Sequence, residues 1–256
     1  MVDEATPTNT QETQWWAKFF IFSAVLSLII LVSGPFGYKY GITDLAPSLI
    51  SVLVALAGAL LVFVVGIIMA IVATRKGLPR ERNMIFIAMV ISLIPMVFIV
   101  PQMMKARSVP PIHDISTDTI NPPEFNVVVA LRKDAPNDLI YAHEDSAETL
   151  AKLQTEAYPD LQPTVTELSV EAAVNRATNI LKSQGLEIVS SDTAAGIVEA
   201  TATTFWFGFK DDVVVRATAG SAGTTIDVRS VSRVGQSDVG ANAARIKKFL
   251  DAFTSA

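Results

Sequence analysis

Three long apolar runs occupy most of the first 104 residues, and only short polar segments separate them. The first run is "WWAKFFIFSAVLSLIILVSG" at 15–34, the second covers about 49–73, and the third covers about 84–104. Each run has roughly the 20 residues that a helix needs to cross a hydrocarbon layer about 30 Å thick. The pattern therefore predicts a membrane anchor over residues 1–104 that contains three transmembrane helices.

The first run also resembles a secretory signal peptide. Its apolar stretch is long, however, the residues before it are acidic, and no small-x-small cleavage motif follows it. We expect a retained helix that begins at the interfacial residues Trp15 and Trp16. Pro95 and Pro101 are expected to kink or end the third helix. No charged residue lies deep in a run, which favours an anchor over a transport path.

Basic residues are unevenly distributed around these runs. The segment "TRKGLPRERN" at 74–83, between the second and third runs, carries four Arg or Lys residues. The loop before the second run has one Lys and one Asp, although Lys105 and Arg107 follow the third run. Because basic loops stay in the cytoplasm, we expect a cytoplasmic amino terminus and an extracytoplasmic position for the residues after the third run.

The remainder of the chain has the composition of a folded domain. Residues 105–125 are rich in Pro, Asp, Ser and Thr and predict an extended linker, and residues 126–256 predict an α+β domain. "NVVVALR" at 126–132 is a candidate strand. Two segments predict helices, namely "SAETLAKLQTEAYP" at 146–159 and "LSVEAAVNRATNILKSQG" at 168–185, in which Ser169 is placed as the N-cap.

Four strand signals then follow one another: "LEIVSSD", "GIVEATATT", "DDVVVRATA" and "TTIDVRSVSRV". Their connections are too short for parallel crossovers, so neighbouring strands should be antiparallel. A last helix follows, which Asp238 can cap. The predicted fold class is an α-helical membrane anchor plus an α+β domain, in which helices flank an antiparallel four-stranded meander.

The connection between the second and third of these strands is unusually aromatic. It reads "FWFGFKDD", from Phe205 to Asp212, and its rings fit three roles: core, ligand platform, or wedge against a membrane. Alternation places Phe205 and Phe207 on one side of the hairpin. We expect Trp206 and Phe209, beside a turn at Gly208, to be the exposed rings and candidate ligand-binding residues.

Alternation also collects charges on one face of the sheet. Asp227, Arg229 and Arg233 share a side of the last strand, and Glu199 and Arg216 lie on neighbouring strands. Cross-strand ion pairs are the ordinary explanation of such an open face. The alternative is an anion site, in which Arg216, Arg229 and Arg233 bind a phosphate or carboxylate.

Enzyme signatures are scarce. The sequence has no G-x-S-x-G, P-loop, dinucleotide fingerprint or H-E-x-x-H motif. Weak candidates for a hydrolytic or hard-cation site are His113, Asp114, Asp118, Asp211 and Asp212. Asp and His are also common turn formers in proline-rich linkers, and His143 is interpreted as a surface residue. We predict no metal site and no cofactor.

The net charge and the cysteine content exclude further classes of partner and of chemistry. Residues 105–256 carry 14 basic and 20 acidic side chains, a net charge of −6, which argues against nucleic acid as a partner. The chain has no cysteine, so disulfides, thiol catalysis and thiolate metal sites are excluded.

Over roughly residues 109–254 the chain resembles the domain of unknown function family 1499. The most specific stretch runs from "DDVVVR" to "DVRSVSRVGQSD", and "PPIHDISTDTINPPEF" and "AYPDLQP" lie upstream of it. The resemblance implies a bacterial envelope protein, which places the anchor in the inner membrane and the domain in the periplasm. It implies no activity and no site residues.

These observations predict a membrane-anchored envelope protein whose domain binds a ligand without catalysis. The expected partners are the lipid bilayer and a lipid, a glycan, another anionic ligand or a membrane protein. Small residues at 55–60 ("ALAGAL") would allow close contact with a partner helix. The alternative is a hydrolase-like or metal-dependent envelope enzyme that uses His113 and the acids near it.

Overall fold

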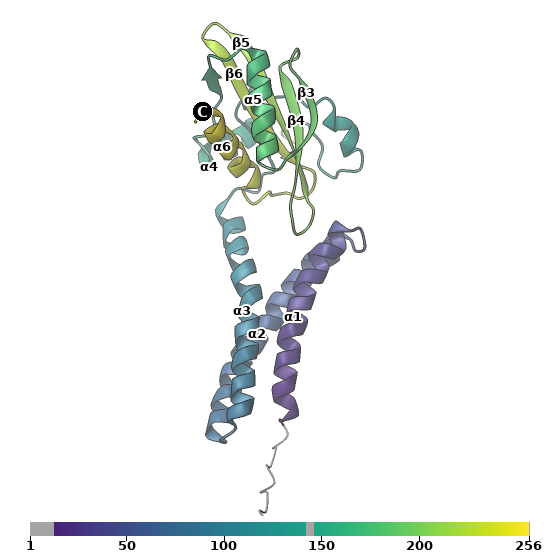
Figure 1. Cartoon of the computed structure of the whole chain (residues 1–256), viewed down its shortest axis with the longest axis vertical. Coiled ribbons are helices and arrows are strands. Elements are labelled where there is room, and N and C mark those ends of the chain that lie inside the picture. The colour runs from purple at the N-terminus through teal and green to yellow at the C-terminus, as the bar shows by residue number, and fades with distance from the viewer. Residues whose placement is uncertain (1–12, 142–145, 256) are drawn as a thin grey trace, which may run out of the picture. The chain divides into compact units, whose positions relative to one another are not determined.

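The structure, a computed structural model, describes residues 13–141 and 146–255. The chain divides into two units, residues 1–101 and residues 102–256. Figure 1 shows the three amino-terminal helices in purple to blue and the later sheet and helices in green to yellow. Each unit has its own hydrophobic packing.

The predicted apolar helices are confirmed: α1 (Trp15–Lys39), α2 (Leu45–Arg75) and α3 (Pro79–Ser108). All three are long and apolar enough to cross a membrane. Each extends beyond its apolar run because the flanking polar residues continue the helix. α3 does not end at Pro95 or Pro101, since a proline removes only one helical hydrogen bond and a long helix retains the others.

Helices α1 and α2 approach each other closely through small residues. A methyl carbon added at Gly34 of α1 would lie 1.7 Å from Ser51 Oγ of α2. One added at Gly58 of α2 would lie 2.9 Å from Ser27 Oγ of α1. The small residues at 55–60 are therefore used for packing inside the protein, as Gly, Ala and Ser are in other membrane helices.

The sheet of the second unit is antiparallel, with strand order β1-β6-β5-β4-β3 and with β2 also paired to β6. The predicted meander is confirmed as the four strands β3 to β6, and two short strands are added to it. The strands are β1 (Asp114–Ser116), β2 (Thr164–Thr166), β3 (Glu187–Asp192), β4 (Ile197–Thr203), β5 (Lys210–Gly220) and β6 (Gly223–Ser232).

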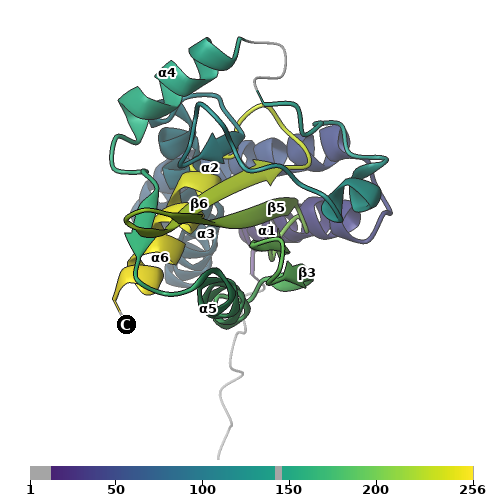
Figure 2. The ribbon, with the colours of Figure 1, turned by 90° about the horizontal axis from the view of Figure 1, so that it is seen from above.

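Helices α5 (Val170–Ser183) and α6 (Ala241–Thr254) cover one face of the sheet (Figure 2). Their apolar side chains form the main core with the inward side chains of β4, β5 and β6. Helix α4 (Ala147–Ala157) is hydrogen-bonded to the edge strand β1, because the side-chain amide of Gln154 both accepts from and donates to the backbone of Ser116. The N-cap residue of α6 is Gly240 and not Asp238, but the Asp238 carboxylate accepts from the amides of Gly240 and Asn242 at the start of the helix.

The other face of the sheet is covered by residues 117–141, which we call the covering segment. The predicted strand at 126–132 is wrong, since Val128–Arg132 forms a 3₁₀ helix, η1. The amides of Asn126, Val127 and Val128 donate to the carboxylate of Glu199, so they are not available to a neighbouring strand. The segment 105–125, predicted as an extended linker, instead contributes a strand to the domain, because β1 lies within it and pairs with β6.

The close approach of α1 and α2 generates a prediction. Gly34→Leu should lower the thermal midpoint of the full-length protein in detergent, because overpacking of this kind costs about 1–3 kcal/mol. The midpoint can be followed by the helical circular dichroism signal. Val32→Leu, at an exposed position of the same helix, is the matched control and should leave the midpoint unchanged. Equal midpoints for the two variants would show that the contact at Gly34 does not limit stability.

Candidate functional site

The charged face predicted from strand alternation exists, and the covering segment buries most of it. Glu199, Asp212, Asp227 and Arg229 are buried, and Arg216 and Arg233 are partly buried. Figure 2 shows the covering segment in teal, across the sheet from α5 and α6. A small apolar cluster of Phe125, Val128, Val214 and Val231 fills the space between the charged groups.

Arg229 joins the sheet to the covering segment at its centre. Its Nε and Nη2 atoms donate to the two carboxylate oxygens of Asp114 at 3.0 and 2.7 Å. The same guanidinium donates to the carbonyls of Pro123 and Leu139, and it lies against the rings of Phe125 and Tyr141. Arg229 is 2% exposed, so its charge is balanced almost wholly by groups of the protein.

Asp212 is the centre of a second buried group. Arg233 donates to both of its oxygens at 2.8 and 2.9 Å, Arg132 of η1 donates at 2.7 Å, and the Thr201 hydroxyl donates at 2.7 Å. Burial by itself would raise the pKa of Asp212. The hydrogen bonds from Arg233, Thr201 and Arg132 outweigh it, and the pKa lies below its ordinary value.

Arg216 forms a third group near the end of the covering segment. It bonds Asp227 on the neighbouring strand at 3.0 Å and Asp118 at 3.2 Å, and it also donates to the carbonyl of Asn121. Burial raises the pKa of Asp227, although Arg216 acts in the opposite direction. This group is the most accessible of the three, because the Arg216 and Asp118 side chains are about a quarter exposed.

Asp211 points to the helix side of the sheet, away from Asp212. Its partner is Arg245 of α6 at 2.7 Å, and Arg245 also bonds Ser230 and Asn242. Arg132 and Arg245 were not among the expected partners of the acid pair. Arg245 precedes Ile246 on the face of α6 that packs on the sheet, and that helical spacing was the one signal for it.

The five residues considered for catalysis are therefore distributed over several places. His113 Nδ1 lies 3.3 Å from the carbonyl of Gln236, and each of the four acids has an arginine partner. Among residues 13–141 and 146–255, no group of three or more His, Asp or Glu residues is arranged to hold a metal ion. His143 lies outside the described residues. These contacts do not test a catalytic role for the five residues, so that role stays a prediction.

The three arginines considered for anion binding also have protein partners. Arg216, Arg229 and Arg233 each contact at least one carboxylate, so an added phosphate or carboxylate would compete with Asp118, Asp114 or Asp212. An anion-binding role for them stays a prediction.

The aromatic loop, residues 204–209, connects β4 to β5. Phe205 is 72% exposed, whereas Trp206, Phe207 and Phe209 are partly buried. The rings of Phe207 and Phe209 stack with their centroids 4.8 Å apart. Phe205, and not Trp206 or Phe209, is thus the most exposed ring. The alternation of side chains along a strand does not apply to these rings, because β4 ends at Thr203 and the chain turns after it. Gly208, at a φ of +68°, is the left-handed residue of this turn.

Hydrogen bonds place this loop at a particular end of the sheet. The amide of Ser232 donates to the carbonyl of His113, and the amide of Arg233 donates to the carbonyl of Lys210. The start of β1, the end of β6 and the start of β5 are therefore neighbours. Only residues 109–113 separate α3 from β1, so the aromatic loop lies at the end of the sheet where the chain arrives from α3.

Fold and site define a class: an α+β domain with a sheet covered on both faces, preceded by three helices that are long and apolar enough to cross a membrane. The profile of the family described as "Protein of unknown function (DUF1499)" matches residues 114–253, and the chain belongs to this family. The match confirms the resemblance seen in the sequence and leaves the apolar helices outside it. No curated protein matches the chain.

The Asp212 group generates a prediction for stability. Asp212→Asn should destabilise the second unit by about 3–5 kcal/mol at pH 7, because it leaves Arg132 and Arg233 without a buried counter-charge. Pulse proteolysis of the full-length protein in detergent measures this change. Asp251→Asn, which removes the exposed pair with Lys247, is the control and should cost about 0–1 kcal/mol.

The lowered pKa of Asp212 also predicts a pH dependence. A carboxylate whose pKa is lower in the folded state stabilises the fold above its unfolded pKa of about 3.9, and this contribution is lost as the pH falls through the folded pKa. The difference in stability between the wild type and Asp212→Asn should therefore be largest near pH 7 and shrink below about pH 4. A difference that grows on acidification would contradict the assignment.

Proposed function

We propose that the protein is a membrane-anchored protein of the bacterial envelope whose second unit is a binding domain without catalysis. One observation carries this proposal. The acids and arginines suited to chemistry are paired with one another, whereas Phe205, the most exposed ring of the aromatic loop, lies at the end of the sheet joined to the last apolar helix. Binding through an apolar loop needs none of the paired charges.

The partner that best fits the aromatic loop is the lipid surface. Trp favours the boundary between head groups and hydrocarbon, where its apolar body is dry and its N–H is wet, and Phe can insert on the apolar side of that boundary. Lys210 follows the loop directly and suits anionic head groups. The short connection 109–113 keeps this end of the sheet within reach of the bilayer that α3 would cross. We infer that the loop contacts the interface and orients the domain on it.

Fluorescence quenching tests the contact of the aromatic loop with lipid. In vesicles, a protein with Trp15→Phe and Trp16→Phe retains Trp206 as its only tryptophan. We expect brominated lipids to quench Trp206 and aqueous acrylamide to quench it weakly, because the ring lies in the interface. Phe205→Asp should reverse this order, since a charge opposes insertion.

A probe at the other end of the sheet is the control for this experiment. Val165 of β2 is exposed and pairs with Thr225, near the start of β6. Val165→Trp, in a background without the other tryptophans, should be quenched by acrylamide and not by brominated lipids. The lipid partner is rejected if Trp206 behaves like the probe at 165.

We also propose that the anchor lies in the inner membrane, with a cytoplasmic amino terminus and a periplasmic second unit. The basic segment at 74–83 supports this orientation, because Lys and Arg are retained on the cytoplasmic side. Alkaline phosphatase fused after Ala256 should be active in cells, whereas the same enzyme fused after Gly77 should be inactive. The opposite pair of activities would show that the second unit lies in the cytoplasm and would contradict the proposed orientation.

A further inference from the structure

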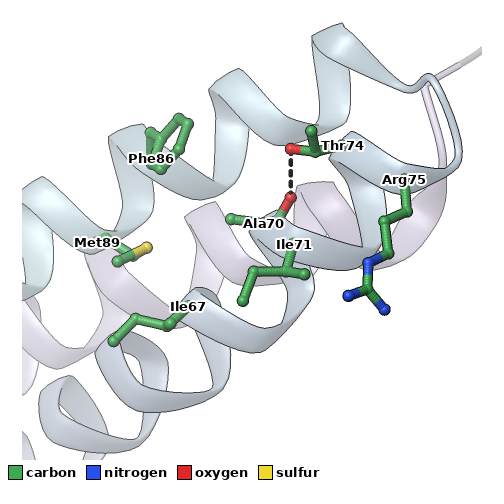
Figure 3. A pocket seen from close by; sticks show the side chains of 7 residues that line it. All are labelled: Ile67, Ala70, Ile71, Thr74, Arg75, Phe86 and Met89. Carbon is green, nitrogen blue, oxygen red and sulfur yellow. Dashed lines mark hydrogen bonds between the residues drawn. The ribbon is translucent and has the colours of Figure 1, made fainter.

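A groove lies between α2 and α3 near the turn that joins them. Figure 3 shows the lining residues that α2 contributes, from Ile67 to Arg75, together with Phe86 and Met89 from α3. The groove is open on one side and has a volume of about 380 Å³. Its lining residues are Ile67, Ala70, Ile71, Thr74, Arg75, Phe86 and Met89.

The groove has a closed apolar floor and open apolar walls. Ala70 packs in a buried cluster with Ile85 and Met89, which closes the side toward the helix interior. Ile71 on α2 and Phe86 on α3 are 51% and 47% exposed and form the walls. Both walls lie in helices suited to lipid, so the natural content of the space is a hydrocarbon chain.

A partner helix fits this groove poorly. Close packing between membrane helices uses Gly, Ala and Ser, which let the backbones approach. A helix placed here would meet the bulky side chains of Ile67, Ile71 and Phe86 instead. A single flexible acyl chain can lie between them.

Arg75 supplies a positive charge at the end of the groove. Thr74 is engaged within α2, because its hydroxyl donates to the Ala70 carbonyl at 2.8 Å. No described acid forms an ion pair with Arg75. The one acid in the segment 74–83, Glu81, is buried and accepts from the amide of Gln14. The rim therefore attracts anions.

The apolar and charged parts are spaced as a phospholipid requires. Ile67 and Arg75 are eight residues apart on one helix, which is about 12 Å along the axis. We propose that the groove binds one anionic glycerophospholipid, with an acyl chain between α2 and α3 and its phosphate at Arg75. This site is separate from the aromatic loop, and it would stand if the function proposed above failed.

Native mass spectrometry of the full-length protein in detergent tests the phosphate contact. The probes are phosphatidylglycerol and phosphatidylcholine with identical acyl chains. Arg75→Gln should weaken phosphatidylglycerol binding about fivefold, the ratio that corresponds to roughly 1 kcal/mol for one basic residue near lipid, and should change phosphatidylcholine binding little. Lys76→Gln removes the same charge one residue away, outside the groove, and is the matched control. Equal effects of the two variants would show that the lipid responds only to the net positive charge of this segment, and would overturn the proposal.

A second pair of variants tests the acyl chain contact. Ile71→Trp fills the groove and should reduce the binding of both lipids, whereas Ile68→Trp, at an exposed position on α2 outside the groove, should reduce neither. Because both side chains point out of the bundle, helix content should be unchanged. Retained lipid binding in Ile71→Trp would overturn the site. So would a photocrosslinker at residue 71 that captures a protein and no phospholipid in cells.

Discussion

The second unit depends on burying charges in matched pairs beneath one segment of chain. A charge can leave water only if a partner and further hydrogen bonds replace its hydration, and removing one partner of such a pair is strongly destabilising. Arg229 meets this condition through Asp114 and two carbonyls, and Asp212 meets it through Arg132, Arg233 and Thr201. The covering segment supplies several of these groups, so its position and the charge of the sheet face depend on each other.

This constraint decides which parts of the protein remain open to partners. Because both faces of the sheet are covered, the loops at its ends provide the exposed surface suited to recognition. In the aromatic loop, Phe205 is the most exposed of the four rings. In the first unit, small residues are used by the α1–α2 contact, while the side of α2 and α3 that ends at Arg75 keeps an open groove. Both surfaces are the ones for which we propose lipid contacts, one at the interface and one along the hydrocarbon.

Much of the fold follows from local patterns. The lengths of the apolar runs predict α1, α2 and α3, and the short connections predict the antiparallel meander. Asp238 accepts from an amide in the first turn of α6, although Gly240 occupies the N-cap position. The errors occur where distant residues intervene. The valines at 127–129 match a strand pattern, but the carboxylate of Glu199, more than 70 positions along the chain, takes the amides that a strand would use. No window around residue 128 contains that information.

The sequence by itself determined which residues are apolar over a helix length, which alternate along a strand, and hence that Asp227, Arg229 and Arg233 share a face. These properties depend on helical and strand periods, which act over a few residues. Only the tertiary structure decided that this face is covered, that Asp114 and Asp212 are the partners of its arginines, and that Phe205 is the ring exposed at the turn. Burial and ion pairing depend on which distant segments meet, and no local period encodes that meeting.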